Sequence, residues 1–269
     1  MKKMIAAAVL CSAVFPAAQA QDQLFTRPGW MVGAQASSYQ YHEPNMNGGG
    51  PDFAKLTGNM GGLLGSYTWT NSSHVWSTID LREAYGRLKY EGSGTLNDVP
   101  NTIIEGRAVV GMDFLAGSSL SFSPYVGLGY RYLYDDNRGY SSSNSVGYRR
   151  SSNYVYAPVG LTMRFDMGSR WVLAPTLEYD VFLQGRQTSD LADTDIPGLM
   201  NVTNDQSKGY GYRGYLMLEK DHWAFGVWTH YWSIKESDIV GISTIDPTLG
   251  GQEPKNWTRE SGIELRYRF

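Results

Sequence analysis

Four histidines and a few acidic clusters are the residues that could support hydrolytic or metal chemistry. A histidine that activates water needs a carboxylate within hydrogen-bond reach. Asp221 is adjacent to His222, while the Asp193-Thr194-Asp195 run has no histidine beside it. The sequence also has no closely spaced His/carboxylate set of the kind that holds zinc. We therefore predict no catalytic residue, no metal site and no cofactor. The histidines are His42, His74, His222 and His230.

Motifs for a serine nucleophile and for calcium are equally weak. The G-x-S-x-G elbow of serine hydrolases does not occur in the sequence. Asp135-Asp136-Asn137 is rich in oxygen but lacks the spacing of a calcium-binding loop, and a turn explains it better. The sequence therefore predicts a protein that is not an enzyme.

Charged side chains recur instead on one side of regularly alternating segments. Side chains alternate across a strand, so residues of one parity share a face. The charged parity contains acidic and basic residues in similar number. If the strands close into a narrow barrel with this face inside, the opposite charges should pair across its lumen. We predict that Arg107, Glu178, Asp180 and Arg213 lie near mid-barrel, and that five glycines of this parity, among them Gly129 and Gly160, leave space beside them. The predicted polar network is Glu105, Arg107, Arg131, Arg164, Glu178, Asp180, Arg213, Glu260 and Glu264, with Asp113, Asp166, Glu219, Arg266 and Arg268 on the same faces.

The elements that must position these charges are ten amphipathic strands. Apolar residues occupy the other parity of each segment, which is typical of strands with one apolar face. The segments exceed the usual strand of about 5–6 residues and reach the 9–11 that cross a bilayer. They are 29–41, 58–70, 75–90, 102–115, 120–134, 153–167, 170–184, 209–219, 223–235 and 256–269, with the boundaries before residue 90 least defined.

The connections alternate between short and long. Short ones are predicted near 71–74, 116–119, 167–169 and 220–222. An even strand count with short turns at one end and long loops at the other is typical of transmembrane β-barrels. We therefore predict an all-β, closed, antiparallel up-and-down barrel. The predicted long loops are 42–57, 91–101, 135–152, 185–208 and 236–255.

Aromatic residues gather near both ends of the predicted strands. Two aromatic belts are expected where a barrel meets the two membrane interfaces. The predicted belt beside the short turns contains Trp69, Trp76, Trp171 and Trp223. The other contains Tyr39, Tyr90, Tyr130, Tyr132, Tyr134, Tyr154, Tyr156, Tyr210, Tyr212 and Trp257.

The first twenty residues predict a cleaved secretory signal. Lys2 and Lys3 precede an apolar stretch, and Ala18-Gln19-Ala20 is a typical cleavage site. Its removal leaves 21–269 as one barrel domain, takes away the only cysteine, Cys11, and lowers the net charge from −3 to −5. A nucleic-acid partner would require a basic face, so we predict none.

These features together resemble bacterial outer-membrane β-barrel proteins, in particular opacity-like and small porin-like surface barrels. The last strand carries Ile263, Leu265, Tyr267 and Phe269 on one face. That ending resembles the signal by which the outer-membrane assembly machinery recognises its substrates. The resemblance implies a location in the outer membrane of a Gram-negative bacterium, with membrane lipid and the assembly machinery as partners.

Three functions are compatible with this class. The first is a surface protein with a lumen plugged by side chains, whose loops bind an extracellular ligand for adhesion or recognition. Tyr140, Tyr148, Arg138, Arg149 and Arg150 in segment 135–152 favour this function, because such residues make adaptable binding surfaces. The second is a narrow porin-like channel for small polar solutes. The third is a protease of the omptin family, whose paired acids face an Asp-x-His pair; that pair is missing in this sequence. The sequence does not identify the ligand, the solute or the oligomeric state, nor whether the lumen is open.

Overall fold

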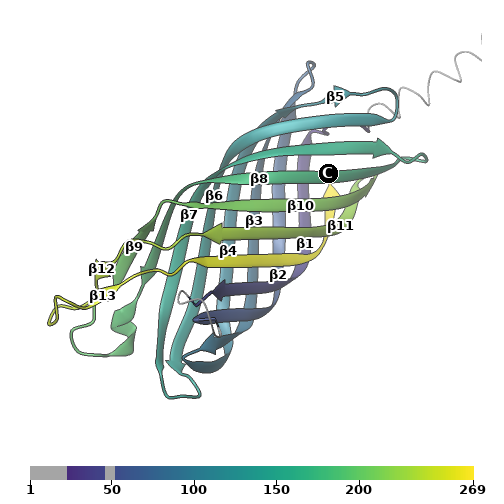
Figure 1. Cartoon of the computed structure of the whole chain (residues 1–269). Coiled ribbons are helices and arrows are strands. Elements are labelled where there is room, and N and C mark those ends of the chain that lie inside the picture. Colours follow the sequence, from purple (N-terminus) through teal and green to yellow (C-terminus); the bar gives the residue numbers. More distant parts are fainter. Residues whose placement is uncertain (1–22, 46–51) are drawn as a thin grey trace, which may run out of the picture.

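The computed structural model describes residues 23–45 and 52–269, which form one elongated β-barrel (Figure 1). No helix in these ranges is long and apolar enough to cross a membrane. Besides the barrel there are four short strands, β5 (Phe114–Leu115), β9 (Val202–Gln206), β12 (Val240–Gly241) and β13 (Gly250–Gly251), and one 3-10 turn, η1 (Leu191–Thr194). Ten strands close the ring: β1 (Gly29–Glu43), β2 (Ala54–Thr70), β3 (Val75–Gly92), β4 (Gly94–Met112), β6 (Leu120–Tyr140), β7 (Val146–Asp166), β8 (Trp171–Ser189), β10 (Gly209–Lys220), β11 (Trp223–Ile234) and β14 (Asn256–Arg268).

Pairing of the first strand with the last closes the barrel. β1 and β14 are antiparallel from Met31↔Arg268 to His42↔Trp257, and the other long strands pair with their neighbours in the chain, β8 with β10. A closed ring satisfies the backbone hydrogen bonds of every strand and leaves no open edge. The predicted closed, antiparallel up-and-down barrel is confirmed.

An apolar belt on the outer surface encircles the barrel over the half of its height that lies next to the short turns. It covers the strand halves next to the short turns and follows from the alternation of apolar and polar residues. A soluble protein rarely exposes so large a continuous apolar surface, whereas a membrane barrel turns it toward lipid. The belt includes Trp30, Val32, Leu63, Leu81, Val110, Val126, Leu128, Val159, Leu177, Leu216, Phe225, Val227, Ile263 and Leu265, all exposed.

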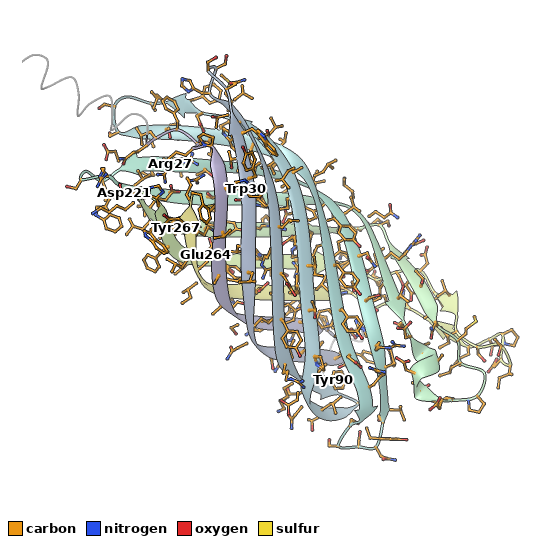
Figure 2. All side chains as sticks on the ribbon, turned by 180° about the vertical axis from the view of Figure 1, so that it is seen from behind. Arg27, Trp30, Tyr90, Asp221, Glu264 and Tyr267 are labelled. Atoms are coloured by element: carbon orange, nitrogen blue, oxygen red, sulfur yellow. The ribbon has the colours of Figure 1, made fainter. Side chains whose placement is uncertain are left out.

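The two ends of the barrel differ. At the turn end, tight connections join the strands, as at 71–74, where the Asn71 side chain accepts hydrogen bonds from the backbone N–H groups of Ser73 and Val75. The strands continue past the belt at the other end, which we call the loop end. Figure 2 shows Arg27 and Asp221 at the turn end and Tyr90 toward the loop end.

Two of the predicted long loops are mostly strand. β3 and β4 meet around Ser93, so 91–101 is largely a hairpin, and β6 and β7 extend to Tyr140 and Val146 within 135–152. Above the belt the outer face of the strands meets water and no longer needs to be apolar, so the apolar–polar alternation ends although the backbone pairing continues. Asp135-Asp136-Asn137 is therefore not a turn; it lies in β6 at a register shift.

The other three predicted loops keep irregular parts. Segment 185–208 contains the end of β8, η1 and β9, and segment 236–255 contains the β12–β13 hairpin. Part of 42–57, and the predicted signal segment 1–20, lie outside the described residues.

The predicted aromatic belts are partly wrong. Trp76, Tyr39, Tyr154 and Tyr156 are buried inside the barrel, whereas Trp69, Trp171, Trp223, Tyr130 and Tyr212 are exposed. The prediction used the position of each residue along its strand and neglected its parity.

Inward glycines make room for two of the buried rings. A Cβ atom on Gly129 would lie 2.2 Å from the Tyr156 ring, and one on Gly160 would lie 2.2 Å from the Tyr125 ring. Gly129 pairs with Tyr156, and Gly160 with Tyr125, across β6 and β7. Each tyrosine therefore lies flat against the wall where the opposing strand has no side chain.

Candidate functional site

A network of charged side chains crosses the barrel at mid-height. Arg213 on β10 is buried; its Nη2 lies 2.5 Å from Glu105 Oε1, and its Nε lies 2.7 Å from Asp180 Oδ2 and 3.0 Å from Glu178 Oε1. Arg107 Nη1 donates to both oxygens of Glu178, at 2.8 and 2.9 Å. Glu105 lies on β4, and three strands (β6, β7 and β8) separate it from β10 around the ring, so the bond from Arg213 spans the lumen.

Three further residues, Asp80 and Arg82 on β3 and Glu260 on β14, extend this mid-barrel network. Arg82 donates to Glu260 and, at 3.2 Å, to Gln35. Asp80 accepts from Arg107 at 3.1 Å. We define the mid-barrel network as Asp80, Arg82, Glu105, Arg107, Glu178, Asp180, Arg213 and Glu260.

An aromatic layer covers the network on its loop-end side. The Tyr156 hydroxyl donates to Glu105 Oε1 at 2.6 Å and accepts from Arg213 at 2.8 Å. The Arg131 guanidinium lies over the Trp232 ring at 5.6 Å. Buried apolar side chains fill the remaining space, so the layer and the network together occupy the lumen. The layer consists of Tyr39, Met60, Leu88, Ile103, Leu133, Tyr154, Tyr156, Phe182, Trp232 and Ile234.

The nine residues predicted for the polar network all face inward, but the structure brings only six of them together. Arg131 lies in the aromatic layer, and its side-chain nitrogens make no hydrogen bond in the described part of the chain. Arg164 and Glu264 lie nearer the turn end, where Arg164 donates to Ser123 at 2.8 Å and Glu264 pairs with Arg266 at 2.6 Å.

Sequence reasoning missed Asp80, Arg82 and the hydroxyl of Tyr156. In β3 the outward positions also carry charged residues, Glu83 and Arg87, both exposed. Because charges occur on both faces of this strand, the sequence pattern does not show that Arg82 points inward. Tyr156 has the inward parity of β7, and Gly129 has the inward parity of the neighbouring strand β6. Those two observations together could have predicted an inward tyrosine at this position.

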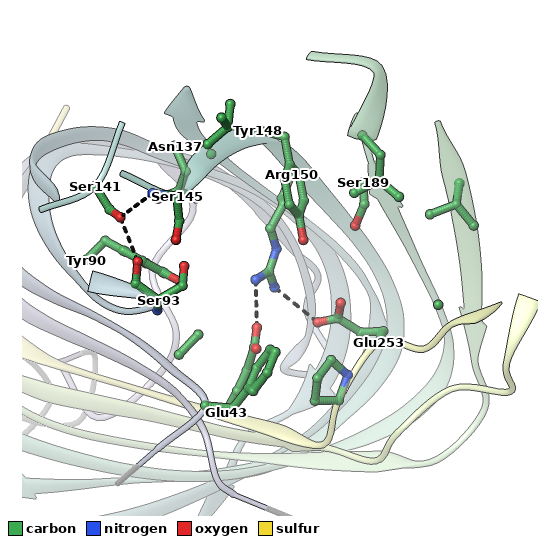
Figure 3. Close-up of a pocket in the computed structure, with 18 of the residues that line it drawn as sticks. Glu43, Tyr90, Ser93, Asn137, Ser141, Ser145, Tyr148, Arg150, Ser189 and Glu253 are labelled. Atoms are coloured by element: carbon green, nitrogen blue, oxygen red, sulfur yellow. Dashed lines mark hydrogen bonds and ion pairs between the residues drawn. The ribbon is translucent and has the colours of Figure 1, made fainter. Parts of the chain in front are cut away.

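A first cavity, of about 260 Å³, opens at the loop end above the aromatic layer (Figure 3). Arg150 Nη1 donates to Glu43 at 2.6 Å, and its Nη2 donates to Tyr41 at 2.7 Å and to Glu253 at 3.1 Å. Segment 135–152 therefore contributes Arg150 to the interior and not to an exposed loop. Ser93, Ser141, Ser145 and Asn137 also line the cavity, together with Leu96 and the ring of Tyr90.

Carboxylates outnumber the guanidinium in this loop-end cavity. Burial, together with repulsion from Glu43, raises the pKa of Glu253 to about 8, although Arg150 opposes the shift. Burial likewise raises the pKa of Asp135 to about 6. The loop-end cavity therefore holds an excess of acid over base.

A second cavity, of about 170 Å³, lies at the turn end below the network. Arginines dominate its wall, with fewer carboxylates. A small void of about 50 Å³ touches the mid-barrel network beside it. The arginines are Arg27, Arg107, Arg164, Arg266 and Arg268, and the carboxylates are Asp80 and Glu219.

The four histidines do not converge on one site. His42 stacks on Trp257 and contacts Asp52 at the loop end, while His230 is buried and bonds to Tyr215 at 2.6 Å. His74 and His222 lie at the turn end. Within residues 23–45 and 52–269, no cluster of three His, Cys, Asp or Glu side chains is arranged to hold a metal ion.

The four residues of the predicted assembly signal lie on the outer wall of β14. Ile263, Leu265 and Phe269 are exposed, and Tyr267 packs edge-on against Trp223 at 4.8 Å. Their face is continuous with the apolar belt.

No family model and no curated protein matches this sequence. Among solved structures, the outer membrane protease OmpT of Escherichia coli superposes with a TM-score of 0.61 at 12% identity, over 91% of this chain and 98% of that one. Neisserial surface protein A (TM-score 0.36, 14% identity, 90% of this chain and 97% of that one) and Ail of Yersinia pestis (0.33, 11%, 90% and 100%) are more distant.

The likeness to OmpT concerns the fold alone, because 12% identity does not extend to function. The class of protein that the ring and the belt define is the bacterial outer-membrane β-barrel. This confirms the class expected from the sequence.

Proposed function

We propose that this protein is an integral outer-membrane surface barrel without enzymatic activity. Its sealed membrane part anchors an elongated outer part, whose loop-end cavity binds an extracellular ligand for recognition or adhesion. The turn end then faces the periplasm and the loop end faces outward. The observation that carries this proposal is the filled lumen between the two cavities.

The mid-barrel network supports sealing because its charges are already paired. Arg213 and Glu105 come from opposite walls and lie 2.5 Å apart, so hydrated ions would have to break this pair to pass. Buried charges that lose a partner are costly, which makes spontaneous opening unfavourable. The aromatic layer adds an apolar barrier directly above them.

The elongated loop end supports recognition. β6 and β7 each contain 21 residues, about twice the length that a bilayer requires. The cavity at this end combines hydroxyl groups, an amide, a guanidinium and apolar walls. Such a mixed lining suits a small ligand or a side chain inserted by a partner.

The alternative is a narrow channel, and the small void beside the network favours it. Planar-bilayer conductance of the refolded protein separates the two functions. We expect no unitary steps from the wild type and steps from the double variant R213S/E105S. The double variant R186S/D205S, which removes an exposed pair at 3.1 Å, is the control and should stay silent. Stable steps from the wild type would refute the sealed anchor.

A protease assay tests the proposed lack of enzymatic activity. Glu43 and Glu253 form an acidic pair, but both bond to Arg150, and no histidine of the described residues lines their cavity. We expect the refolded protein to leave a diverse peptide library intact. Cleavage that disappears in the H42N variant would replace the proposal by an omptin-like function, since His42 and Asp52 form the one imidazole–carboxylate contact of the described loop end.

We further propose that Ile263, Leu265, Tyr267 and Phe269 bind the outer-membrane assembly machinery. The F269S variant should assemble poorly in cells yet refold normally in detergent, as followed by heat-modifiable migration on gels. Normal assembly in cells would contradict this role.

A further inference from the structure

The turn-end cavity has more positive charge than its carboxylates neutralise. Arg27 Nη2 pairs with Glu219 at 3.1 Å. Arg164 reaches Asp113 only at 3.8 Å, and Arg268 forms no ion pair with any carboxylate in the described ranges. Arg27 is the one arginine of the described residues that is ion-paired with Glu219, and Arg164 and Arg268 lie within electrostatic range of the same carboxylate.

The bonding of Arg268 leaves its charge available. Nη1 donates to the backbone oxygen of Arg27 at 2.8 Å, and Nη2 contacts the sulfur of Met31 at 3.8 Å. Its Nε is buried and has no hydrogen-bond partner among the residues that the structure describes. A neutral carbonyl and a thioether leave the positive charge of the guanidinium uncompensated.

Hydroxyl groups surround the same space. Thr68 and Thr78 bond to each other at 2.9 Å, and Thr162 and Thr176 bond at 2.8 Å. Each pair uses one hydroxyl proton internally and retains the other, which can be donated into the cavity. All four threonines line it.

We propose that the turn-end cavity binds a small tetrahedral oxyanion of the phosphate class. Guanidinium forks match phosphate oxygens in pairs, and hydroxyl donors complete such sites. An anion placed between Arg164 and Arg268 would relieve the repulsion among the three arginines. Since the mid-barrel network closes the cavity above, the anion enters and leaves by the turn end.

Two sources share this chemistry. Free phosphate or a phosphate monoester could enter from the aqueous side. The headgroup of an anionic phospholipid could enter laterally, because Trp223 lines the cavity and is exposed at the level of the apolar belt.

Titration of the refolded full chain with inorganic phosphate at low ionic strength, followed by calorimetry, tests the proposal. We expect saturable binding that weakens at least about tenfold in R268Q and in R164Q, as expected when a bidentate charged contact is lost. R170Q is the matched control, because Arg170 lies at the same end but is 65% exposed and pairs with Asp221. It should bind like the wild type.

Competition by nanodiscs containing phosphatidylglycerol would assign the site to a lipid headgroup, and lack of competition would assign it to free phosphate. Thermal unfolding identifies a misfolded variant, and the two independent variants keep the test decisive if one does not fold. No saturable binding by the wild type, or equal weakening in R170Q, would overturn the proposal. Both results are independent of the conductance experiment.

Discussion

The two cavities of this barrel are lined by different ionisable groups: carboxyl groups outnumber guanidiniums at the loop end, and guanidiniums outnumber carboxyl groups at the turn end. At the loop end, one arginine, Arg150, faces the carboxylates Glu43 and Glu253. At the turn end, Arg27 pairs with Glu219 and Arg164 with Asp113, while Arg268 has no ion-paired carboxylate among the described residues. The mid-barrel network lies between them. Every charged side chain of the mid-barrel network contacts a group of opposite sign, whereas Arg268 at the turn end has no such partner in the described ranges. We infer a structural role for the middle and binding roles for the ends.

The largest effect should follow from disrupting the middle. R213A would leave Glu105, Glu178 and Asp180 buried without their shared guanidinium. We expect a loss of about 3–5 kcal/mol in the free energy of unfolding, the usual cost of breaking a buried charge cluster. Denaturant unfolding in detergent micelles measures it.

R186A is the control for this experiment, because Arg186 and Asp205 form an exposed pair at 3.1 Å. Its expected cost is about 0–1 kcal/mol. Equal losses of unfolding free energy in R213A and R186A would mean that the mid-barrel network does not stabilise the barrel.

Packing in the aromatic layer should give the next largest effect. G129A places a methyl group 2.2 Å from the Tyr156 ring, whereas nothing lies within 4 Å of the equivalent position on Gly61. Overpacking a rigid site costs about 1–3 kcal/mol. G129A should therefore unfold at lower denaturant concentration than G61A, and identical midpoints would argue against a tightly packed layer.

The smallest predicted effect distinguishes the two ends by pH. Glu253 has its folded pKa raised from 4.5 to about 8 by burial and by Glu43, partly offset by Arg150. A raised acid pKa adds stability that is complete below pH 4.5 and is lost as pH rises through 8. Tyr41, Asp135, Tyr148 and Tyr154 are further titratable groups near this carboxyl.

Amide hydrogen exchange of segment 236–255, corrected for the intrinsic rate, should therefore show protection that falls as the pH rises from 4.5 to about 8 in the wild type. E253Q removes the titrating group, so its protection should change little over that range. An unchanged pH profile in E253Q would contradict the role of Glu253. The turn-end segment 221–222 serves as an internal control.

Alternation was sufficient to predict the ring and the inward faces of its clearest strands. Glu105, Glu178, Asp180 and Arg213 lie on strands where apolar and polar positions alternate without interruption, and their side chains do face inward. Which of them meet across the lumen depends on closure and strand stagger. Those quantities are set by long-range pairing and leave no local trace in the sequence.

The ends of the strands were not predictable in the same way. Beyond the belt, water contacts the outer face, so the sequence around residues such as Asp136 and Arg149 predicts a loop although these two residues pair across β6 and β7. The loop-end cavity combines Glu43, Arg150 and Glu253 from three distant parts of the chain. Only the three-dimensional fold brings them together.

One labelling experiment tests the separation of the two cavities most directly. Ser189 lines the loop-end cavity and Ser66 the turn-end cavity. S189C and S66C are introduced singly, and a small membrane-impermeant thiol reagent is added to one side of oriented proteoliposomes. We predict that S189C reacts only from the loop-end side and S66C only from the turn-end side. Reaction of both cysteines from one side would contradict a sealed lumen.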